Sequence, residues 1–261
     1  MLPLLVLAGG FGTRLAEYTD VIPKPMVTIG GNPILIHIME HFAQFGVTEF
    51  VIATGYKSEV VKRHFVDFAT INSDVEVQTR TGEVRRLSTD FQFDWKVTLV
   101  DTGLETMTGG RLKRLEPYLG NEDFFMTYGD GIANVNLEDL RELHNSVEES
   151  VATVTAVRPA ARFGELELDG FRVSSFKEKP QIEQGWINGG FFVLSPSIFD
   201  YIAGDSTIFE KDPLERLASE GRLTAFKHSG FWQCMDTKRD RDYLEGLWAS
   251  GKPPWREVQR H

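Results

Sequence analysis

Short apolar runs alternate with amphipathic helical patterns along the first 157 residues. The runs typical of buried strands cover residues 4–8, 48–54, 97–100, 124–128 and 151–157, and the helical patterns cover 33–45, 58–68, 112–119 and 137–146. Asn32 and Pro33 predict an N-cap and a first-turn proline, and Gly46 ends the first of these helices. Because alternating strands and helices are typical of parallel sheets covered on both faces, the pattern predicts an α/β fold with a mostly parallel sheet.

The second half of the chain has a different pattern. Its predicted elements are a hairpin over residues 165–173, a strand over 187–194 and a final helix over 238–248. The hairpin is centred on Asp169-Gly170, a dipeptide favoured in tight turns. The stretch 78–95 is predicted to form a protruding loop or flap. Because no Gly/Ser-rich or Pro-rich linker separates the halves, we expect a single domain over residues 1–261 that ends in a helix and tail from 237 to 261.

The composition is that of an ordinary globular protein of 261 residues, with 41% hydrophobic and 25% charged residues. A formal net charge of −10 argues against a general nucleic-acid binder, which needs a basic surface. The single cysteine, Cys234, excludes an intramolecular disulfide and fits a reducing compartment. No apolar run is long enough to cross a bilayer, and the apolar residues 2–8 lack the basic flank of a signal peptide. We therefore expect a cytoplasmic protein with no nucleic-acid and no membrane partner.

A glycine-rich turn, residues 9–14 (GGFGTR), follows the first predicted strand. Ligands of open parallel sheets bind where strands end, and glycines there let backbone N–H groups approach an anion. Thr13 adds a hydroxyl, Arg14 a planar fork for phosphate oxygens, and Lys24 a point charge held between two prolines. A dinucleotide fingerprint would need glycine where Leu15 stands, and a Walker A lysine is absent. The turn therefore predicts an anion site of another kind, against the alternative of a turn without a ligand.

Two aspartates and one charged run are further candidates. Asp130 follows the predicted strand 124–128, and Asp236 precedes the final helix. Two carboxylates with phosphate oxygens and water are a common Mg²⁺ arrangement, although a turn aspartate and a helix N-cap are the structural alternatives. The run KEKP at 177–180 would ordinarily be a solvated charged turn.

Residues 37–41 (HIMEH) match the H-x-x-E-H pattern of a zinc protease group. The same helix carries Ile34, Ile38 and Phe42 on a core-packing face, and no third ligand is placed beside the two histidines. We therefore expect the histidines to be structural and not zinc ligands.

The segments LAGGFGTRL at 7–15 and PKPM at 23–26 resemble the signature of the sugar-1-phosphate nucleotidylyltransferase family. The segments at 97–103, 107–114, 127–131, 176–180, 187–192, 230–233 and 235–237 are similar to the cytidylyltransferases acting on glucose 1-phosphate, a branch of that family. The resemblance covers nearly the whole chain in order. It implies a single Rossmann-like nucleotidyltransferase domain, with a mostly parallel mixed sheet, helices on both faces and a small hairpin or flap region.

The resemblance also implies a reaction and a set of site residues. The cytidylyl group of CTP would pass to α-D-glucose 1-phosphate by in-line attack on the α-phosphorus, giving CDP-glucose and pyrophosphate. The nucleotide would contact Leu7, Ala8, Gly9, Gly10, Phe11, Gly12, Thr13, Arg14, Lys24, Thr106, Arg111 and Gly129, with Arg14 and Lys24 catalytic. The sugar phosphate would contact Tyr128, Glu178, Lys179, Asn188 and Gly189, and Mg²⁺ would be held by Asp130 and Asp236.

The loop carrying Thr106 and Arg111 is expected to protrude and to reach across a subunit boundary. The family resemblance suggests a homo-oligomer, with a hexamer as one form, that supplies CDP-glucose for dideoxysugars of the lipopolysaccharide O-antigen. Cys234 is expected to be a small buried residue, and the segment 82–94 matches the family least.

Two alternatives stay open. The same chemistry could use UTP or dTTP, because no identifiable side chain reads the ring position that distinguishes these bases. The chain could also be a non-catalytic sugar-nucleotide sensor, which is disfavoured because Arg14, Lys24, Asp130 and Asp236 are all present.

Overall fold

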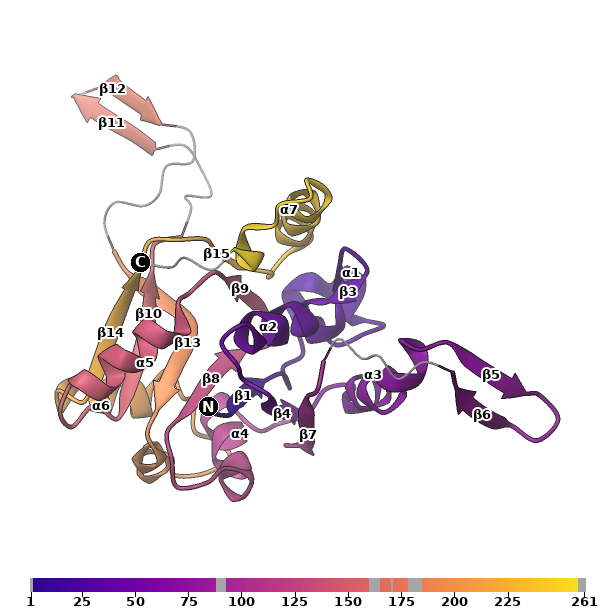
Figure 1. Ribbon diagram of the computed structural model, residues 1–261. Coiled ribbons are helices and arrows are strands. Elements are labelled where there is room, and N and C mark those ends of the chain that lie inside the picture. The colour runs from indigo at the N-terminus through magenta and orange to yellow at the C-terminus, as the bar shows by residue number, and fades with distance from the viewer. Residues whose placement is uncertain (1, 88–92, 160–164, 170, 178–184, 258–261) are drawn as a thin grey trace.

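A mixed sheet forms the centre of the computed structural model, which describes residues 2–87, 93–159, 165–169, 171–177 and 185–257 (Figure 1). Within those residues the sheet has seven strands in the order β14 (Leu223–His228), β10 (Ala152–Val157), β13 (Ile187–Leu194), β8 (Phe124–Tyr128), β1 (Leu4–Leu7), β4 (Glu49–Thr54) and β7 (Lys96–Asp101). β13 is antiparallel to both neighbours, and the other pairs are parallel. The predicted α/β fold with a mostly parallel sheet is confirmed.

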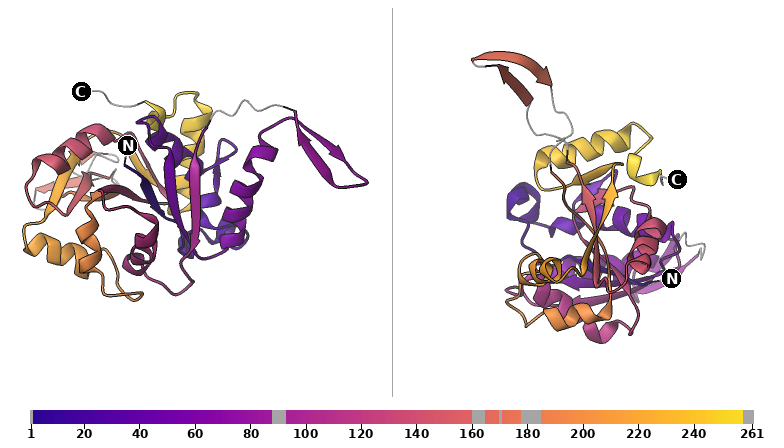
Figure 2. Two further views of the ribbon diagram at one scale, coloured as in Figure 1. Left: turned by 60° about the horizontal axis from the view of Figure 1, so that its bottom comes forward. Right: turned by 90° about the vertical axis from the view of Figure 1, so that its left-hand side faces the viewer.

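Both faces of this sheet are buried, which explains the continuous apolar runs of its strands. In β1, Leu4 and Val6 belong to one core cluster and Leu5 and Leu7 to the other. The first face is covered by α2 (Ile34–Ala43), α3 (Ser58–Ile71), α5 (Leu137–Ser146) and α7 (Lys238–Ala249), and the second by α4 (Thr108–Leu115) and α6 (Asp212–Ser219) (Figure 2). Side chains therefore alternate between two separate cores along each strand.

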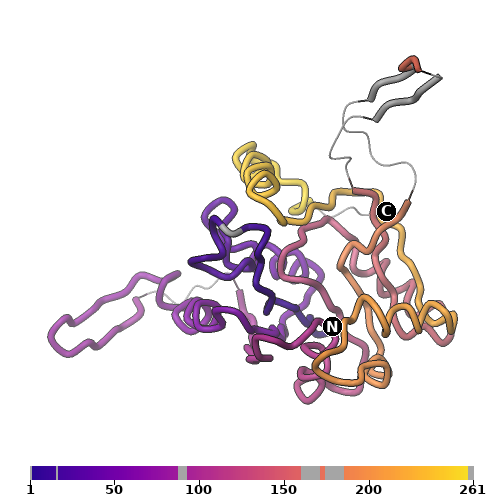
Figure 3. Tube along the Cα trace, turned by 180° about the vertical axis from the view of Figure 1, so that it is seen from behind, coloured from indigo at the N-terminus to yellow at the C-terminus, as the bar shows by residue number. Residues whose placement is uncertain are grey.

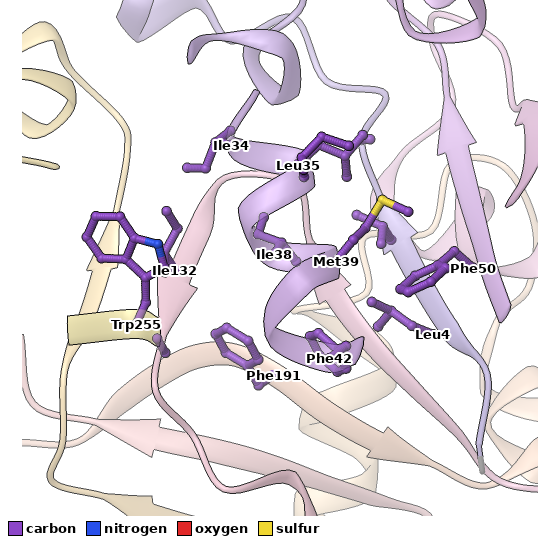
Figure 4. Packing of buried hydrophobic residues seen from close by; sticks show 14 of the residues in the cluster. Leu4, Ile34, Leu35, Ile38, Met39, Phe42, Phe50, Ile132, Phe191 and Trp255 are labelled. Atoms are coloured by element: carbon purple, nitrogen blue, oxygen red, sulfur yellow. The ribbon is translucent and has the colours of Figure 1, made fainter. Parts of the chain in front are cut away.

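Helix α2 packs its apolar face onto the sheet, as Figure 4 shows for Ile34, Ile38 and Phe42. The Phe42 ring lies 5.9 Å from the Phe191 ring and 5.6 Å from the Phe125 ring, both on sheet strands. Deleting such a buried aromatic side chain costs about 3–5 kcal/mol of stability. This helix therefore depends on the sheet behind it.

The predicted start of α2 is wrong by one residue. Asn32 and Pro33 form the short strand β3 (Asn32–Pro33), paired with β2 (Thr28–Ile29), and the helix begins at Ile34 without a side-chain cap. Asn32 pairs with Ile29 in this ladder and so is not the cap. Gly46 follows the helix with a φ of 82°, a conformation that suits glycine.

Helix α4 begins four residues before the predicted 112–119 pattern. Gly109 and Gly110 lie inside this helix. The 204–210 segment packs so closely against them that a side chain would not fit at either position. A Cβ at Gly110 would lie 2.5 Å from the Asp205 Cα atom. The glycines here permit close packing and do not end the helix.

Two hairpins project from the body on different sides (Figures 1 and 3). One pairs β5 (Val75–Gln78) with β6 (Glu83–Arg86), and the other pairs β11 (Glu165–Asp169) with β12 (Arg172–Lys177). The predicted hairpin at 165–173 is confirmed by the pairing of Asp169 with Arg172, and Gly170 lies outside the described residues. Of the predicted flap, residues 88–92 also lie outside them.

The shorter elements complete the described chain. They are α1 (Ala16–Thr19), β9 (Gly131–Ala133), β15 (Trp232–Cys234) and the 3₁₀ helices η1 (Thr13–Leu15), η2 (Lys24–Met26), η3 (Glu116–Tyr118), η4 (Pro196–Tyr201) and η5 (Pro254–Arg256). Among the described helices, none has the length and apolarity needed to span a membrane.

Candidate active site

A cavity of about 420 Å³ opens where β1 and β8 end. Its lining includes all twelve residues expected to contact the nucleotide: Leu7, Ala8, Gly9, Gly10, Phe11, Gly12, Thr13, Arg14, Lys24, Thr106, Arg111 and Gly129. Tyr128 and Asp130 line it as well. Parallel strands end at one edge of the sheet, and this is why segments distant in sequence meet here.

The glycine turn is shaped by close contacts that exclude side chains. Gly12 has a φ of 63°, and a Cβ there would lie 2.9 Å from the Thr19 Cγ2 atom and 3.1 Å from the Lys24 Cβ atom. The Thr19 hydroxyl donates a hydrogen bond to the Gly12 carbonyl at 3.1 Å. Glycine is therefore required at position 12 for both conformation and space.

A buried guanidinium lies beneath the turn. Arg111 is 5% exposed and donates to the Thr102 hydroxyl at 2.7 Å and to the Leu104 carbonyl at 3.1 Å. Within the described residues it forms no ion pair, and burial lowers its pKa. An arginine keeps its proton under such conditions, so Arg111 places a positive charge in the lining of the cavity.

Thr106 and Arg111 are buried within their own chain, and the expected contact across a subunit boundary stays a prediction. Thr106 is 8% exposed and Arg111 is 5% exposed. Leu104 and Met107 of the same loop are 52% and 46% exposed, so the loop is also part of the surface. Met107 N–H donates to the Asp205 carbonyl at 2.8 Å, and Arg114 pairs with the Asp205 carboxylate at 2.6 Å. Both Thr106 and Arg111 line the cavity of their own chain.

Four charged side chains meet beside the cavity, and three of them, Arg14, Lys24 and Asp130, line it. Lys24 Nζ lies 2.7 Å from Asp130 Oδ2 and 2.6 Å from Asp236 Oδ1, and an Arg14 nitrogen lies 2.8 Å from Asp236 Oδ2. Burial lowers the pKa of Lys24, but the charge and hydrogen bonds of Asp130 and Asp236 outweigh it and the pKa is raised. The ammonium therefore stays protonated between the two carboxylates.

A short strand pair brings the two aspartates together. β15 pairs with β9 so that Cys234 lies opposite Gly131, and Met235 N–H donates to the Asp130 carbonyl at 2.8 Å. Asp236 then stands beside Asp130. The helix-cap alternative for Asp236 is wrong, because the Thr237 side chain caps α7 in a capping box with Asp240.

The two carboxylates are suited to a divalent cation. Donor atoms of Asp130, Cys234 and Asp236 all lie within 4.8 Å of one another. Carboxylates favour hard cations such as Mg²⁺, whereas a thiol favours soft ones. Burial and the neighbouring carboxylates raise the pKa of Cys234, so its thiol stays protonated and is a poor ligand. Cys234 is half-buried, not buried as expected.

The residues expected at the sugar phosphate are only partly described. The Tyr128 hydroxyl donates to Glu210, and burial together with that carboxylate raises the pKa of Tyr128 well above the usual value. Asn188 Oδ1 accepts the Gly190 N–H at 2.8 Å, and Gly189 precedes that glycine in the same strand. Glu178 and Lys179 lie outside the described residues.

Glu210 is a site residue that the sequence did not suggest. Its carboxylate accepts hydrogen bonds from the Tyr128 hydroxyl and, at 2.6 Å, from the Thr108 hydroxyl. Tyr128 and Thr108 both line the cavity, so Glu210 links two of its lining residues. No motif marks this residue in the sequence; the bond depends on tertiary packing.

The two histidines of α2 are buried, His37 being 1% and His41 2% exposed. His37 Nε2 lies 2.8 Å from the Ile29 carbonyl, and Glu40 pairs with Arg256 at 3.1 Å. Within the described residues, neither histidine belongs to a cluster with metal-ligand spacing.

Comparison with known proteins places this site in a family. The nucleotidyl transferase family model matches residues 4–246, and the chain belongs to that family of enzymes. The chain is 48% identical to the glucose-1-phosphate cytidylyltransferase of Salmonella typhi over 255 residues, which are 97% of this chain and 98% of the relative. It is 41% identical to the "Probable glucose-1-phosphate cytidylyltransferase" of Bacillus subtilis, again over 97% of this chain and 98% of the relative.

Among solved structures, HddC from Yersinia pseudotuberculosis matches with a TM-score of 0.70 and 26% identity, covering 95% of this chain and 100% of that one. The family resemblance and the nucleotidyltransferase fold expected from the motifs are confirmed.

Proposed function

We propose that the chain transfers the cytidylyl group of CTP to α-D-glucose 1-phosphate, giving CDP-glucose and pyrophosphate. The observation that carries the proposal is the meeting of Arg14, Lys24, Asp130 and Asp236 at a glycine-lined cavity. Phosphoryl-type transfer needs mainly positioning and charge neutralisation, and these groups supply both. The names of the relatives in Salmonella and Bacillus support CTP and glucose 1-phosphate as the substrates.

The nucleotide occupies the cavity in this proposal. The backbone N–H groups of the glycine turn and the exposed Arg14 guanidinium bind its phosphates, and Lys24 meets the charge that develops during attack. Arg111 adds positive potential from beneath Gly9 without leaving its hydrogen bonds to Thr102 and Leu104. When bound, Mg²⁺ supplies charge neutralisation, and Asp130 and Asp236 are the residues that would hold it.

The sugar phosphate is assigned to the neighbouring wall. Asn188 and Gly189 at the start of β13 and Tyr128 at the end of β8 would contact the sugar, with Tyr128 fixed by Glu210. Glu178 is assigned sugar hydroxyls and Lys179 the phosphate, on the family motif alone. We also propose that residues 1–261 act as one domain.

The test is pyrophosphate release with glucose 1-phosphate and each of CTP, UTP and dTTP. CTP is expected to give the highest kcat/KM, and preference for UTP or dTTP would replace the base assignment. Lys24→Ala is the matched control, expected to lose on the order of 10²–10³ in kcat because one donor to the reacting phosphates is gone. Binding without turnover in the wild type would favour the sensor alternative.

A homo-oligomer is part of the proposal. The β5–β6 hairpin leaves Val77 and Val84, which pair with each other, 50% and 49% exposed. A lone two-stranded hairpin is marginal in water, and apolar residues along it favour contact with another subunit. Light scattering should give a mass that is a multiple of the mass of one chain, with a hexamer as one form. The double variant Val77→Lys/Val84→Lys should lower that mass.

Biological placement follows from the product. We propose that the enzyme supplies CDP-glucose for dideoxysugars of the lipopolysaccharide O-antigen. A cytoplasmic location suits an enzyme with one reduced thiol at its site. Loss of CDP-glucose in a deletion strain, measured by mass spectrometry, tests this placement.

A further inference from the structure

The ammonium of Lys24 lies where it holds both proposed metal ligands at once. It contacts one oxygen of Asp130 at 2.7 Å and one oxygen of Asp236 at 2.6 Å, and its side chain is only 12% exposed. The same three residues cannot keep this arrangement and also receive a divalent cation between the carboxylates. A cation there would stand beside a buried ammonium and repel it.

The charges of these four side chains already balance. Asp130 and Asp236 contribute two negative charges, and Lys24 and Arg14 contribute two positive ones. A divalent cation entering this site therefore gains little from the carboxylates. The carboxylates become available once the ammonium has another anionic partner.

The path of the lysine side chain provides that alternative. Its stem passes Gly12, where an added Cβ would lie 3.1 Å from Lys24 Cβ and 3.6 Å from Lys24 Cδ, and Lys24 also lines the nucleotide cavity. The backbone is held in the short helix η2, which begins after Pro23, so the flexible stem alone must move. The ammonium thus stands between the carboxylates on one side and the phosphate space on the other.

We propose that Lys24 is an internal competitor for the divalent-cation site, and that a bound triphosphate draws its ammonium away and so releases Asp130 and Asp236 to the metal. This inference rests on the proposed function, because it uses the metal ligands and the nucleotide cavity assigned there. Metal and nucleotide then bind with positive coupling, and each raises the affinity of the other by the same factor.

The direct test is Mn²⁺ binding to the nucleotide-free protein, measured from the electron paramagnetic resonance signal of free Mn²⁺. Lys24→Met, which keeps the length of the stem and removes the charge, is expected to bind Mn²⁺ on the order of tenfold more tightly than the wild type, within the usual range of coupling between sites. Lys24→Gln, which is neutral and still polar, guards against misfolding of the Met variant and should also gain affinity.

Two charge-matched controls separate competition from general electrostatics. Arg14→Met removes a cation that pairs with Asp236, one of the two carboxylates, and whose side chain is 73% exposed, so a smaller gain is expected. Lys96→Met removes a surface cation paired with Glu49 and should leave Mn²⁺ affinity unchanged. Equal gains in all three variants would overturn the proposal.

Different results would contradict the competitor role of Lys24 and the metal site formed by Asp130 and Asp236. If Asp130→Asn abolishes Mn²⁺ binding but Lys24→Met binds no more tightly than the wild type, the competitor role is wrong and the metal site stands. If Asp130→Asn in the Lys24→Met background leaves Mn²⁺ binding intact, the carboxylate site itself is wrong. The same measurement is then made with a saturating concentration of the α,β-methylene analogue of CTP and corrected for Mn²⁺ held by free analogue. The difference in Mn²⁺ affinity between the wild type and Lys24→Met should then disappear. An unchanged difference would rule out displacement of the ammonium by the triphosphate.

Discussion

The Arg111 guanidinium lies directly beneath Gly9, so that a Cβ at position 9 would stand 2.1 Å from an Arg111 nitrogen. Arg111 cannot simply swing aside, because its bond to Thr102 is buried and its bond to the Leu104 carbonyl is part-buried. We therefore expect substitution to be most damaging at Gly9, which touches the buried arginine, and not at Gly12, which has the positive φ angle.

Gly9→Ala is expected to destabilise the protein by about 2 kcal/mol, since it breaks a hydrogen bond of a charged group. The same variant should lose nucleotide affinity because the turn and Arg111 must both shift. Urea unfolding and calorimetric titration with CTP measure the two effects. Gly10→Ala is the matched control, because nothing lies within 4 Å of a Cβ there. Equal stability of the two variants would show that Arg111 gives way freely.

Asp130→Asn and Asp236→Asn are each expected to abolish most metal-dependent turnover. Both carboxylates bond to the same ammonium and would share one cation, so they act as a unit. The double variant should therefore be little worse than either single one. Turnover should vanish with EDTA and return with excess Mg²⁺. Wild-type turnover and metal dependence in either single variant would remove that aspartate from the site.

Tyr128→Phe and Glu210→Gln are expected to act through one shared hydrogen bond. Tyr128→Phe removes the donor and Glu210→Gln removes the charge of the acceptor, so a double-mutant cycle in urea should give a coupling of about 1 kcal/mol. Both variants should raise KM for glucose 1-phosphate more than KM for CTP. Thr108→Val removes the other donor to Glu210 and should leave the sugar KM nearer to that of the wild type. Independent, additive losses would mean that Glu210 does not position Tyr128.

The strands could be predicted from sequence because two buried faces demand continuous apolar runs. The run from Leu4 to Leu7 serves both cores, and the observed β1 begins and ends close to the predicted bounds. The ends of the helices were harder to predict, since they depend on contacts with segments distant in the sequence. The start of α2 is shifted by the β2–β3 pairing, and α4 starts early because Asp205 packs on Gly110.

The candidate site likewise has parts that could be predicted from the sequence and parts that depend on tertiary contacts. Asp130 could be placed near the glycine turn, since both follow parallel strands. The arrival of Asp236 depends on β9 and β15, which are three residues each and too short for a recognisable period. The ion pairs of Lys24 with both aspartates could not be predicted, because they depend on side-chain directions that no sequence spacing encodes.

Buried neutral histidines should make stability fall as the pH is lowered. His41 is 2% exposed, and its burial lowers its pKa from 6.5 to about 4. Between these two values the unfolded chain binds a proton that the folded protein excludes, so the free energy of unfolding decreases from about pH 6.5 downwards. The full loss for this one residue is roughly 3 kcal/mol at the lower end of that window. His37 and His144, whose pKa values are also lowered chiefly by burial, add to the same trend.

Replacing His41 by leucine removes this proton and should flatten the pH dependence. Urea unfolding of the wild type and of His41→Leu at a series of pH values from 7 to 4.5 measures the slope, which is expected to be shallower by about one proton in the variant at the acid end. Above pH 7 the two curves should run parallel, because neither the folded nor the unfolded chain protonates this histidine there. The rings of Phe42, Phe45 and Phe191 surround the position, so leucine meets an apolar environment. An unchanged slope would mean that His41 accepts a proton inside the folded protein.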